Sequence, residues 1–194
     1  MNNNSIGIFD SGLGGMTVLK KLTAAFPQES FIFFGDTAHV PYGNKSVASI
    51  QQFTFSIVKF LKSHSVKLII VACNTASAVA ISKIEKKFNI PIIGVISPLE
   101  LYLHSHPKYL RVGIIGTQNT INSKAYEKLI FNYNAKIKTF SQACPLFVPL
   151  IEEGLENHQI AKIIAKEYLD DIIKSKIELL ILGCTHYPII KSTI

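Results

Sequence analysis

Short apolar runs alternate with amphipathic stretches along the whole sequence, and this alternation limits the possible folds more than any other feature. Between the runs, apolar residues recur at helical spacing. They are Ile50, Phe53, Ile57, Phe60 and Leu61 in one stretch and Ile160, Ile163, Ile164 and Ile172 in another. Strand–helix alternation of this kind indicates an α/β fold with mainly parallel sheets flanked by helices. The brief, β-branched runs predict buried strands at residues 6–9, 31–34, 68–72, 92–95, 112–115 and 179–182.

Two parts of the sequence resemble each other, which predicts two similar lobes. Cys73 and Cys184 both follow an apolar strand and a small residue, and polar residues follow both. The predicted strands that carry Gly7 and Gly113 match in the same way and at a similar separation. We therefore expect a first α/β lobe at residues 1–96 and a second at 97–194, related by a pseudo-twofold axis, with the active site between them.

Composition excludes several classes of protein. The 20 Lys and Arg residues exceed the 13 Asp and Glu residues, but the lysines are spread singly, which favours a solvated basic surface over nucleic-acid binding. Three cysteines without a CxxC pair indicate neither a disulfide scaffold nor a zinc site. The sequence shows neither a signal peptide nor a run long enough to span a bilayer, so we expect a cytoplasmic protein that does not contact membranes.

Polar residues follow the ends of the predicted strands. In open α/β sheets, ligands bind beyond the carboxyl ends of the strands, where these loops gather. The first strand is followed by Asp10 and Ser11, the third by Cys73 and the polar pair after it, and the last by Cys184.

The two matching cysteines suggest acid–base chemistry. Cys73 precedes a predicted helix at 75–88, and Cys184 precedes Pro188, which suits the first turn of a helix. A helix N-terminus lowers the pKa of a thiol, so we expect both thiols to ionise readily. A lone cysteine is usually a small buried residue, and we interpret Cys144, which precedes a proline, in that way. Two acid–base groups on opposite sides of a carbon atom would invert its configuration.

Several blocks of the sequence resemble, in order, those of the glutamate racemase branch of the aspartate/glutamate racemase superfamily. They cover essentially the whole chain and include IFDSGLGG (8–15), GDTA (35–38), VPYG (40–43), VACNTAS (71–77), CPLFVPL (144–150) and GCTHYP (183–188). The resemblance implies cofactor-independent racemisation of L- and D-glutamate, which supplies D-glutamate for peptidoglycan. Neither pyridoxal phosphate nor a metal is expected, and GLGG lacks the full dinucleotide-binding pattern.

The resemblance also implies roles for individual residues. Cys73 and Cys184 would be the catalytic acid/bases, with Asp10 near Cys73 and with Glu152 and His186 on the Cys184 side. Taken alone, each residue favours a structural role, with Asp10 as a turn former, Glu152 as a solvated helix residue and His186 as a cap, and the family resemblance reverses that preference. The positions implied to bind substrate are Asp10, Ser11, Tyr42, Gly43, Asn74, Thr75, Thr117, Thr120, Thr185 and His186.

Other functions remain open at this point. A related aspartate racemase or a one-thiol decarboxylase would share the fold, and a truncated, non-catalytic binding or regulatory protein would fit the basic charge. Family members normally continue past the second cysteine block, whereas this sequence stops at Ile194, so we expect uncovered apolar surface on the first lobe. A small-molecule substrate is expected as partner, and a homodimer is left open.

Overall fold

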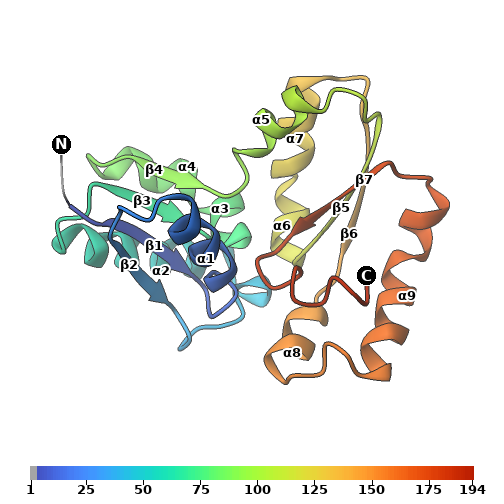
Figure 1. Cartoon of the computed structure of the whole chain (residues 1–194), viewed down its shortest axis with the longest axis horizontal. Helices are drawn as coiled ribbons and strands as arrows, with labels where there is room; N and C mark the ends of the chain where they lie inside the picture. Colours follow the sequence, from blue (N-terminus) through green and yellow to red (C-terminus); the bar gives the residue numbers. More distant parts are fainter. Residues whose placement is uncertain (1–3) are drawn as a thin grey trace.

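The computed structural model describes residues 4–194, which form two α/β lobes side by side (Figure 1). Each lobe has its own parallel sheet, as the sequence predicts. The sheet of the first lobe has the strand order β2-β1-β3-β4, and that of the second has the order β6-β5-β7. No helix within residues 4–194 is long and apolar enough to cross a membrane.

The first lobe places β1 in the middle of its sheet. The strands are β1 (Ile6–Asp10), β2 (Phe31–Gly35), β3 (Leu68–Val71) and β4 (Ile92–Gly94). The helices are α1 (Met16–Ala25), α2 (Val47–Ser63), α3 (Asn74–Val79) and α4 (Ile81–Ile84), with 3-10 turns η1 (Tyr42–Asn44) and η2 (Glu85–Lys87). Alternate residues of the strands face opposite ways, so that Phe9 packs with α2 and Ile8 packs with α1.

The second lobe is built in the same way around β5. Its strands are β5 (Arg111–Gly116), β6 (Lys138–Ala143) and β7 (Leu179–Gly183). Its helices are α5 (Leu99–Ser105), α6 (Gln118–Ser123), α7 (Ala125–Tyr133), α8 (Phe147–Glu152) and α9 (Gln159–Lys174). Ile114 packs with α5 and α7 on one face of the sheet, and Ile115 packs with α8 and α9 on the other.

Three local predictions are wrong. The strand β6 was missed, because its sequence KTFSQA is mostly polar and none of its residues is fully buried. The helix predicted at 75–88 is broken at Ala80, whose φ of −118° ends α3 before α4 begins. The residues after Cys184 form a series of turns instead of a helix, although Pro188 lies among them.

The buried face of α9 agrees only in part with the predicted one, since Ile164 and Ile172 pack into the core but the other two isoleucines do not. Ile160 and Ile163, which suggested the apolar face, are 44% and 60% exposed. The fully buried residues of the helix are Ala161, Ala165, Leu169 and Ile172. The two small alanines let the helix lie close to the sheet. The spacing of large apolar residues alone does not predict that this face is the buried one.

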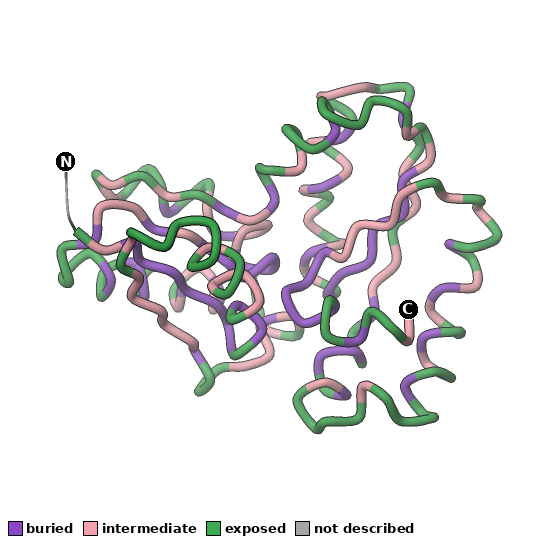
Figure 2. The backbone as a smooth tube through the Cα atoms, viewed as in Figure 1, coloured by how far each residue is buried: buried purple, intermediate pink, exposed green. Residues whose placement is uncertain are grey.

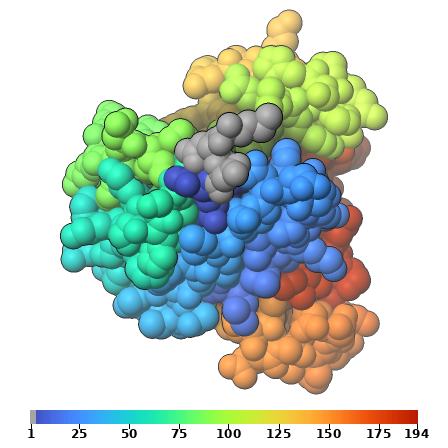
Figure 3. All heavy atoms as spheres, turned by 60° about the vertical axis from the view of Figure 1, so that its left-hand side comes forward, coloured from blue at the N-terminus to red at the C-terminus, as the bar shows by residue number. Residues whose placement is uncertain are grey.

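Helix α1 covers one face of the first sheet but is itself poorly covered. Every residue of α1, all of which the structure describes, is half-buried or exposed (Figure 2). Leu13, Met16 and Phe26 are 60%, 48% and 54% exposed. The blue N-terminal segment that contains them lies on the front of the molecule in Figure 3. Exposed apolar side chains therefore lie at both ends of α1.

Candidate active site

Loops from the carboxyl ends of strands in both sheets meet at one small cavity between the lobes. Its volume is about 10 Å³, about the space that one water molecule needs. Both thiols line it, one from each lobe. The lining consists of Ser11, Pro41, Tyr42, Gly43, Cys73, Asn74 and Thr75 from the first lobe, and Thr117, Val148, Cys184, Thr185 and His186 from the second.

Cys73 lies at the junction of β3 and α3. It is the N-cap of α3, and its Sγ accepts a hydrogen bond from the Ala76 N–H at 3.4 Å. The thiol donates to the Ser11 Oγ at 3.5 Å. Burial raises the pKa of Cys73 to about 11, and the negative charge of Asp10 acts in the same direction. The Cys73 thiol is therefore protonated at neutral pH in this structure.

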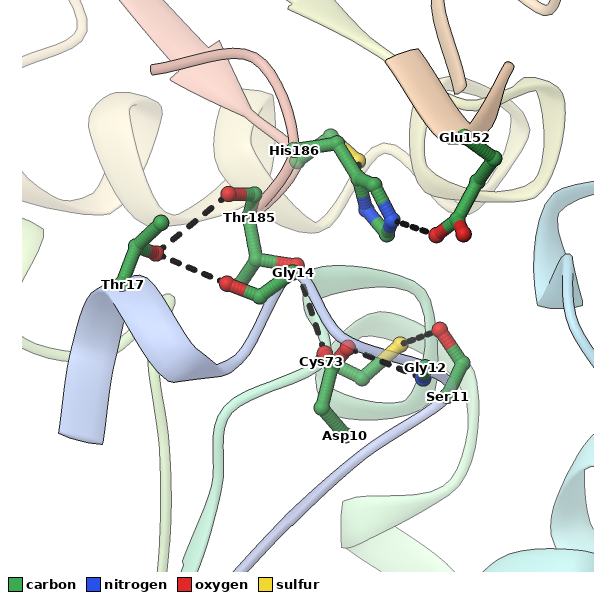
Figure 4. A network of polar contacts seen from close by, with 10 residues as sticks. Asp10, Ser11, Gly12, Gly14, Thr17, Cys73, Glu152, Thr185 and His186 are labelled. Carbon is green, nitrogen blue, oxygen red and sulfur yellow. Dashed lines mark hydrogen bonds and ion pairs between the residues drawn. The ribbon is translucent and has the colours of Figure 1, made fainter. Parts of the chain in front are cut away.

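Cys184 ends β7 and has different neighbours. Its Sγ lies 3.8 Å from the Nδ1 of His186. The Nε2 of His186 lies 2.6 Å from the Oε1 of Glu152, which reaches the site from the end of α8 (Figure 4). Burial raises the pKa of Cys184 well above its usual range, and the negative charges of Asp10 and of Cys73, once that thiol has ionised, add to that effect. The imidazole is the nearest group that can exchange a proton with this thiol.

The prediction that both thiols have lowered pKa values is wrong for this closed structure. Hydrogen bonds from backbone N–H groups do favour both thiolates, as a helix N-terminus would. Burial in an apolar setting disfavours the charged form more strongly, because the cavity admits little water. Cys184 also lacks a helix behind it.

Asp10 joins the two halves of the site. Its carboxylate accepts hydrogen bonds from the Gly12 N–H at 3.0 Å and from the Thr185 hydroxyl, in the other lobe, at 3.3 Å. Burial raises the pKa of Asp10, while the imidazole of His186 acts in the opposite direction. The structure thus places Asp10 near Cys73 and places Glu152 and His186 beside Cys184.

The glycine-rich loop lets the lobes approach closely at this point. A Cβ atom on Gly14 would lie 2.5 Å from the Nδ1 of His186, which is closer than non-bonded atoms come. The Thr17 hydroxyl, at the start of α1, donates to the Gly14 carbonyl at 2.8 Å and to the Thr185 carbonyl at 3.3 Å (Figure 4). The loop therefore holds the turn after Cys184 in place.

The remaining predicted residues form a polar wall. Thr117, the N-cap of α6, lies 2.9 Å from the hydroxyl of Thr75 and 3.0 Å from that of Thr120. Tyr42 lines the cavity, but its hydroxyl donates to Asp36 at 2.6 Å. Three predicted residues, Asp10, Thr120 and Glu152, are not among the lining residues. They contact the lining residues Thr185, Thr117 and His186, respectively.

Sequence reasoning did not assign Tyr126 to the site. Its hydroxyl accepts a hydrogen bond from the Asn74 amide at 2.6 Å and so ties α3 to α7 across the lobes. A tyrosine on an amphipathic helix carries no sequence signal for such a contact. Cys144, which we expected to be structural, is buried in the core of the second lobe beside Phe147.

Within residues 4–194, no three side chains of His, Cys, Asp or Glu are grouped as a metal ion would require. The chemistry that this cavity offers is proton transfer. It holds two thiols, an imidazole paired with a carboxylate, and several hydroxyl and amide groups.

Comparison with known proteins places the chain in a family. Residues 6–194 match the sequence pattern described as Asp/Glu/Hydantoin racemase. A glutamate racemase of Geobacter metallireducens is 46% identical over 190 residues, which cover 98% of this chain and 70% of that protein. A glutamate racemase of Chlorobaculum tepidum is 46% identical over 194 residues, which cover 100% of this chain and 71% of that protein.

Solved structures agree with the sequence comparison. A glutamate racemase from Francisella tularensis in complex with D-glutamate superposes with a TM-score of 0.93 at 46% identity, over 100% of this chain and 73% of that chain. An aspartate racemase homologue from Pyrococcus horikoshii, at 16% identity and a TM-score of 0.67, shares the fold over 98% of this chain and 90% of that chain. By sequence and by fold, this chain belongs to the Asp/Glu/Hydantoin racemase family.

Proposed function

We propose that this protein racemises glutamate by proton transfer between Cys73 and Cys184 and that this reaction supplies D-glutamate for peptidoglycan. The observation that carries the proposal is that one thiol from each lobe lines the same small cavity. The kinship with glutamate racemases indicates the substrate, because the relatives that are 46% identical carry that name.

The reaction needs one proton removed and one returned. The thiolate of one cysteine takes the α-proton, so that the Cα–H bond breaks and an S–H bond forms. The thiol of the other cysteine gives its proton to the opposite face of the planar carbanion, which inverts the configuration. The proton count of the enzyme is unchanged, but the two thiols have exchanged protonation states. The opposite enantiomer runs the same steps in reverse.

The thiols must ionise for this reaction, although burial opposes it. The α-ammonium group of the substrate brings a positive charge into the cavity, which favours the thiolate form. On the Cys184 side, the Nδ1 of His186 is positioned to take the thiol proton, and Glu152 stabilises the resulting imidazolium. We propose that Asp10 receives the ammonium group near Cys73.

The polar wall suits the rest of the substrate. Hydroxyl groups of Ser11, Thr75 and Thr117 and the amide of Asn74 line the cavity and can donate hydrogen bonds to carboxylates. Thr185 and the turn of Tyr42 and Gly43 complete the wall from either side. Thr120 positions Thr117 through their 3.0 Å contact.

The test is exchange of the α-proton of L-glutamate in deuterated water, followed by NMR and by optical rotation. The wild-type protein should exchange the proton and form D-glutamate. Replacing either reactive thiol, as Cys73→Ser or Cys184→Ser, should lower racemisation by at least about a hundredfold, which is the usual effect of removing an acid–base group. Cys144→Ser is the matched control and should keep most of the activity.

The same variants test the cellular role. Wild-type protein should restore growth of a bacterium that requires D-glutamate, and neither reactive-thiol variant should do so. A folded wild-type protein without exchange would refute the proposal, and near-normal activity of Cys73→Ser or Cys184→Ser would refute the two-thiol mechanism. A panel of amino acids that includes aspartate tests the choice of substrate.

A further inference from the structure

The closed cavity raises the question of how a substrate enters it. Glutamate has ten heavy atoms, but the cavity has a volume of only about 10 Å³. A second cavity of about 490 Å³ lies next to it, lined by residues of the η1 turn, the start of α6 and the start of α8. The two cavities share Pro41, Gly43, Thr117 and Val148. These shared residues are the partition between the site and the larger, more open space.

The contact between η1 and α6 holds the partition shut. The Asn119 side chain in α6 donates hydrogen bonds to the Lys45 carbonyl at 2.8 Å and to the Tyr42 carbonyl at 3.2 Å. Tyr42 begins the η1 turn and Lys45 follows its last residue. A hydrogen bond from the Lys45 N–H to the Tyr42 carbonyl closes the turn. One amide group in the second lobe thus binds both ends of a turn in the first lobe.

The packing beneath these hydrogen bonds is tight. A Cβ atom on Gly43 would lie 2.8 Å from the Cβ of Thr117, so the absence of a side chain at Gly43 lets η1 lie directly on the N-cap of α6. The opposite edge of the cavity is held by separate contacts, from Thr17 and Asp10 to Thr185. The hydrogen bond between Thr75 and Thr117 also joins the lobes. The η1 turn can therefore move away from α6 while these other contacts keep the lobes together.

We propose that Asn119 is a latch whose two hydrogen bonds to the η1 turn control access to the cavity. The proposal rests on the proposed function only in that the cavity is the substrate site. Opening breaks the hydrogen bonds to Tyr42 and Lys45 and moves Gly43 away from Thr117, which joins the small cavity to the larger one. Asn119 is a positioning residue, because it does not line the small cavity.

Reaction of the thiols with a small reagent measures this opening directly and needs no turnover. Purified full-length chain is treated with methyl methanethiosulfonate at fixed pH, and the modification of each cysteine is followed by mass spectrometry. Asn119→Ala should increase the rates of modification of Cys73 and Cys184 by about tenfold or more, as expected for the loss of two hydrogen bonds. The rate at Cys144, which lies outside the cavity in the core of the second lobe, should stay unchanged.

Two further variants make the test specific. Gln118→Ala is the matched control, because Gln118 lines the same larger cavity but bonds only to Asn122 of its own helix. It should leave the rates at Cys73 and Cys184 as in the wild type. Asn119→Asp keeps the size of the side chain but turns a donor into a carboxylate that faces two carbonyl oxygens, and it should open the site at least as much as Asn119→Ala.

Equal rates at Cys73 and Cys184 in the wild type and in both Asn119 variants would overturn the latch. A parallel increase at Cys144 would also overturn it, because it would show general loosening of the fold. Increased modification of Cys73 and Cys184 in a protein that does not exchange the α-proton would support the latch and refute the proposed function. The two proposals can therefore fail separately.

Discussion

The carboxylate of Asp10 acts on both thiols, since its negative charge raises the pKa of Cys73 and of Cys184. Removing the charge as Asp10→Asn should lower the pKa of Cys73 below its value of about 11. The measurement is the pH dependence of alkylation at Cys73. Cys144 is an internal control, because burial alone raises its pKa to about 12 and the substitution should not change it. An unchanged or higher pKa at Cys73 would contradict the assigned electrostatics.

The residues of the candidate site could largely be predicted because polar side chains that follow parallel strands meet at one edge of a sheet. Asp10, Cys73, Thr117 and Cys184 all lie in such positions. Their protonation could not be predicted in this way, because the pKa of a buried thiol depends on how much water the closed cavity admits.

Two contacts between the lobes were missed for a different reason. Asn119 bonds to backbone carbonyl groups, and every residue has one, so no particular partner is visible in the sequence. Tyr126 bonds to Asn74 from a helix 52 residues away in the chain. Contacts of this kind depend on how the lobes pack.

At the scale of elements, α9 provides a test of the packing. Leu169 is 4% exposed and Ile163 is 60% exposed. Leu169→Ala should destabilise the protein by about 2–5 kcal/mol, because it removes buried methyl groups and leaves a cavity. Ile163→Ser, on the other side of the same helix, should change stability by less than about 0.5 kcal/mol. Urea denaturation of both variants measures these values, and a larger loss for Ile163→Ser would mean that α9 is rotated.

The strands were predicted more accurately than the helices. All six apolar runs correspond to strands with ends within one residue. The edge strand β6 escaped detection because only Phe140 and Ala143 of its six residues are apolar and none of the six is fully buried. The break at Ala80 has no proline or glycine to signal it. The lobe boundary between residues 96 and 97 stays a prediction.

At the scale of the whole molecule, the buried thiols make folding sensitive to alkaline pH. Burial raises the pKa of Cys73 from 9.0 to about 11 and that of Cys144 to about 12. Above pH 9 the unfolded chain therefore releases protons that the folded chain keeps, which favours unfolding. The stabilising effect is complete below pH 9 and is lost as the pH rises through the folded values.

Because Cys73 ionises more readily in the unfolded chain, we expect it alone to lower the free energy of unfolding by about 2 kcal/mol between pH 8 and pH 11. Thermal unfolding measured by calorimetry between pH 8 and pH 11 should show a falling midpoint. In the Cys73→Ala variant the midpoint should fall less steeply over the same interval, since its hydrophobic replacement cannot ionise. A midpoint that is constant over this range in the wild type would contradict the raised pKa values.

The two lobes repeat one plan, but they surround their thiols differently. Cys73 has Ser11 and Asp10 nearby, whereas Cys184 has the imidazole–carboxylate pair of His186 and Glu152. Mirror-image substrates have equal free energy in water, so a racemase must have the same kcat/KM in both directions whatever surrounds each thiol. Unequal surroundings can make kcat differ between the two directions only if KM differs by the same factor. The enantiomer that is converted faster at saturation must therefore also need a higher concentration to saturate the enzyme.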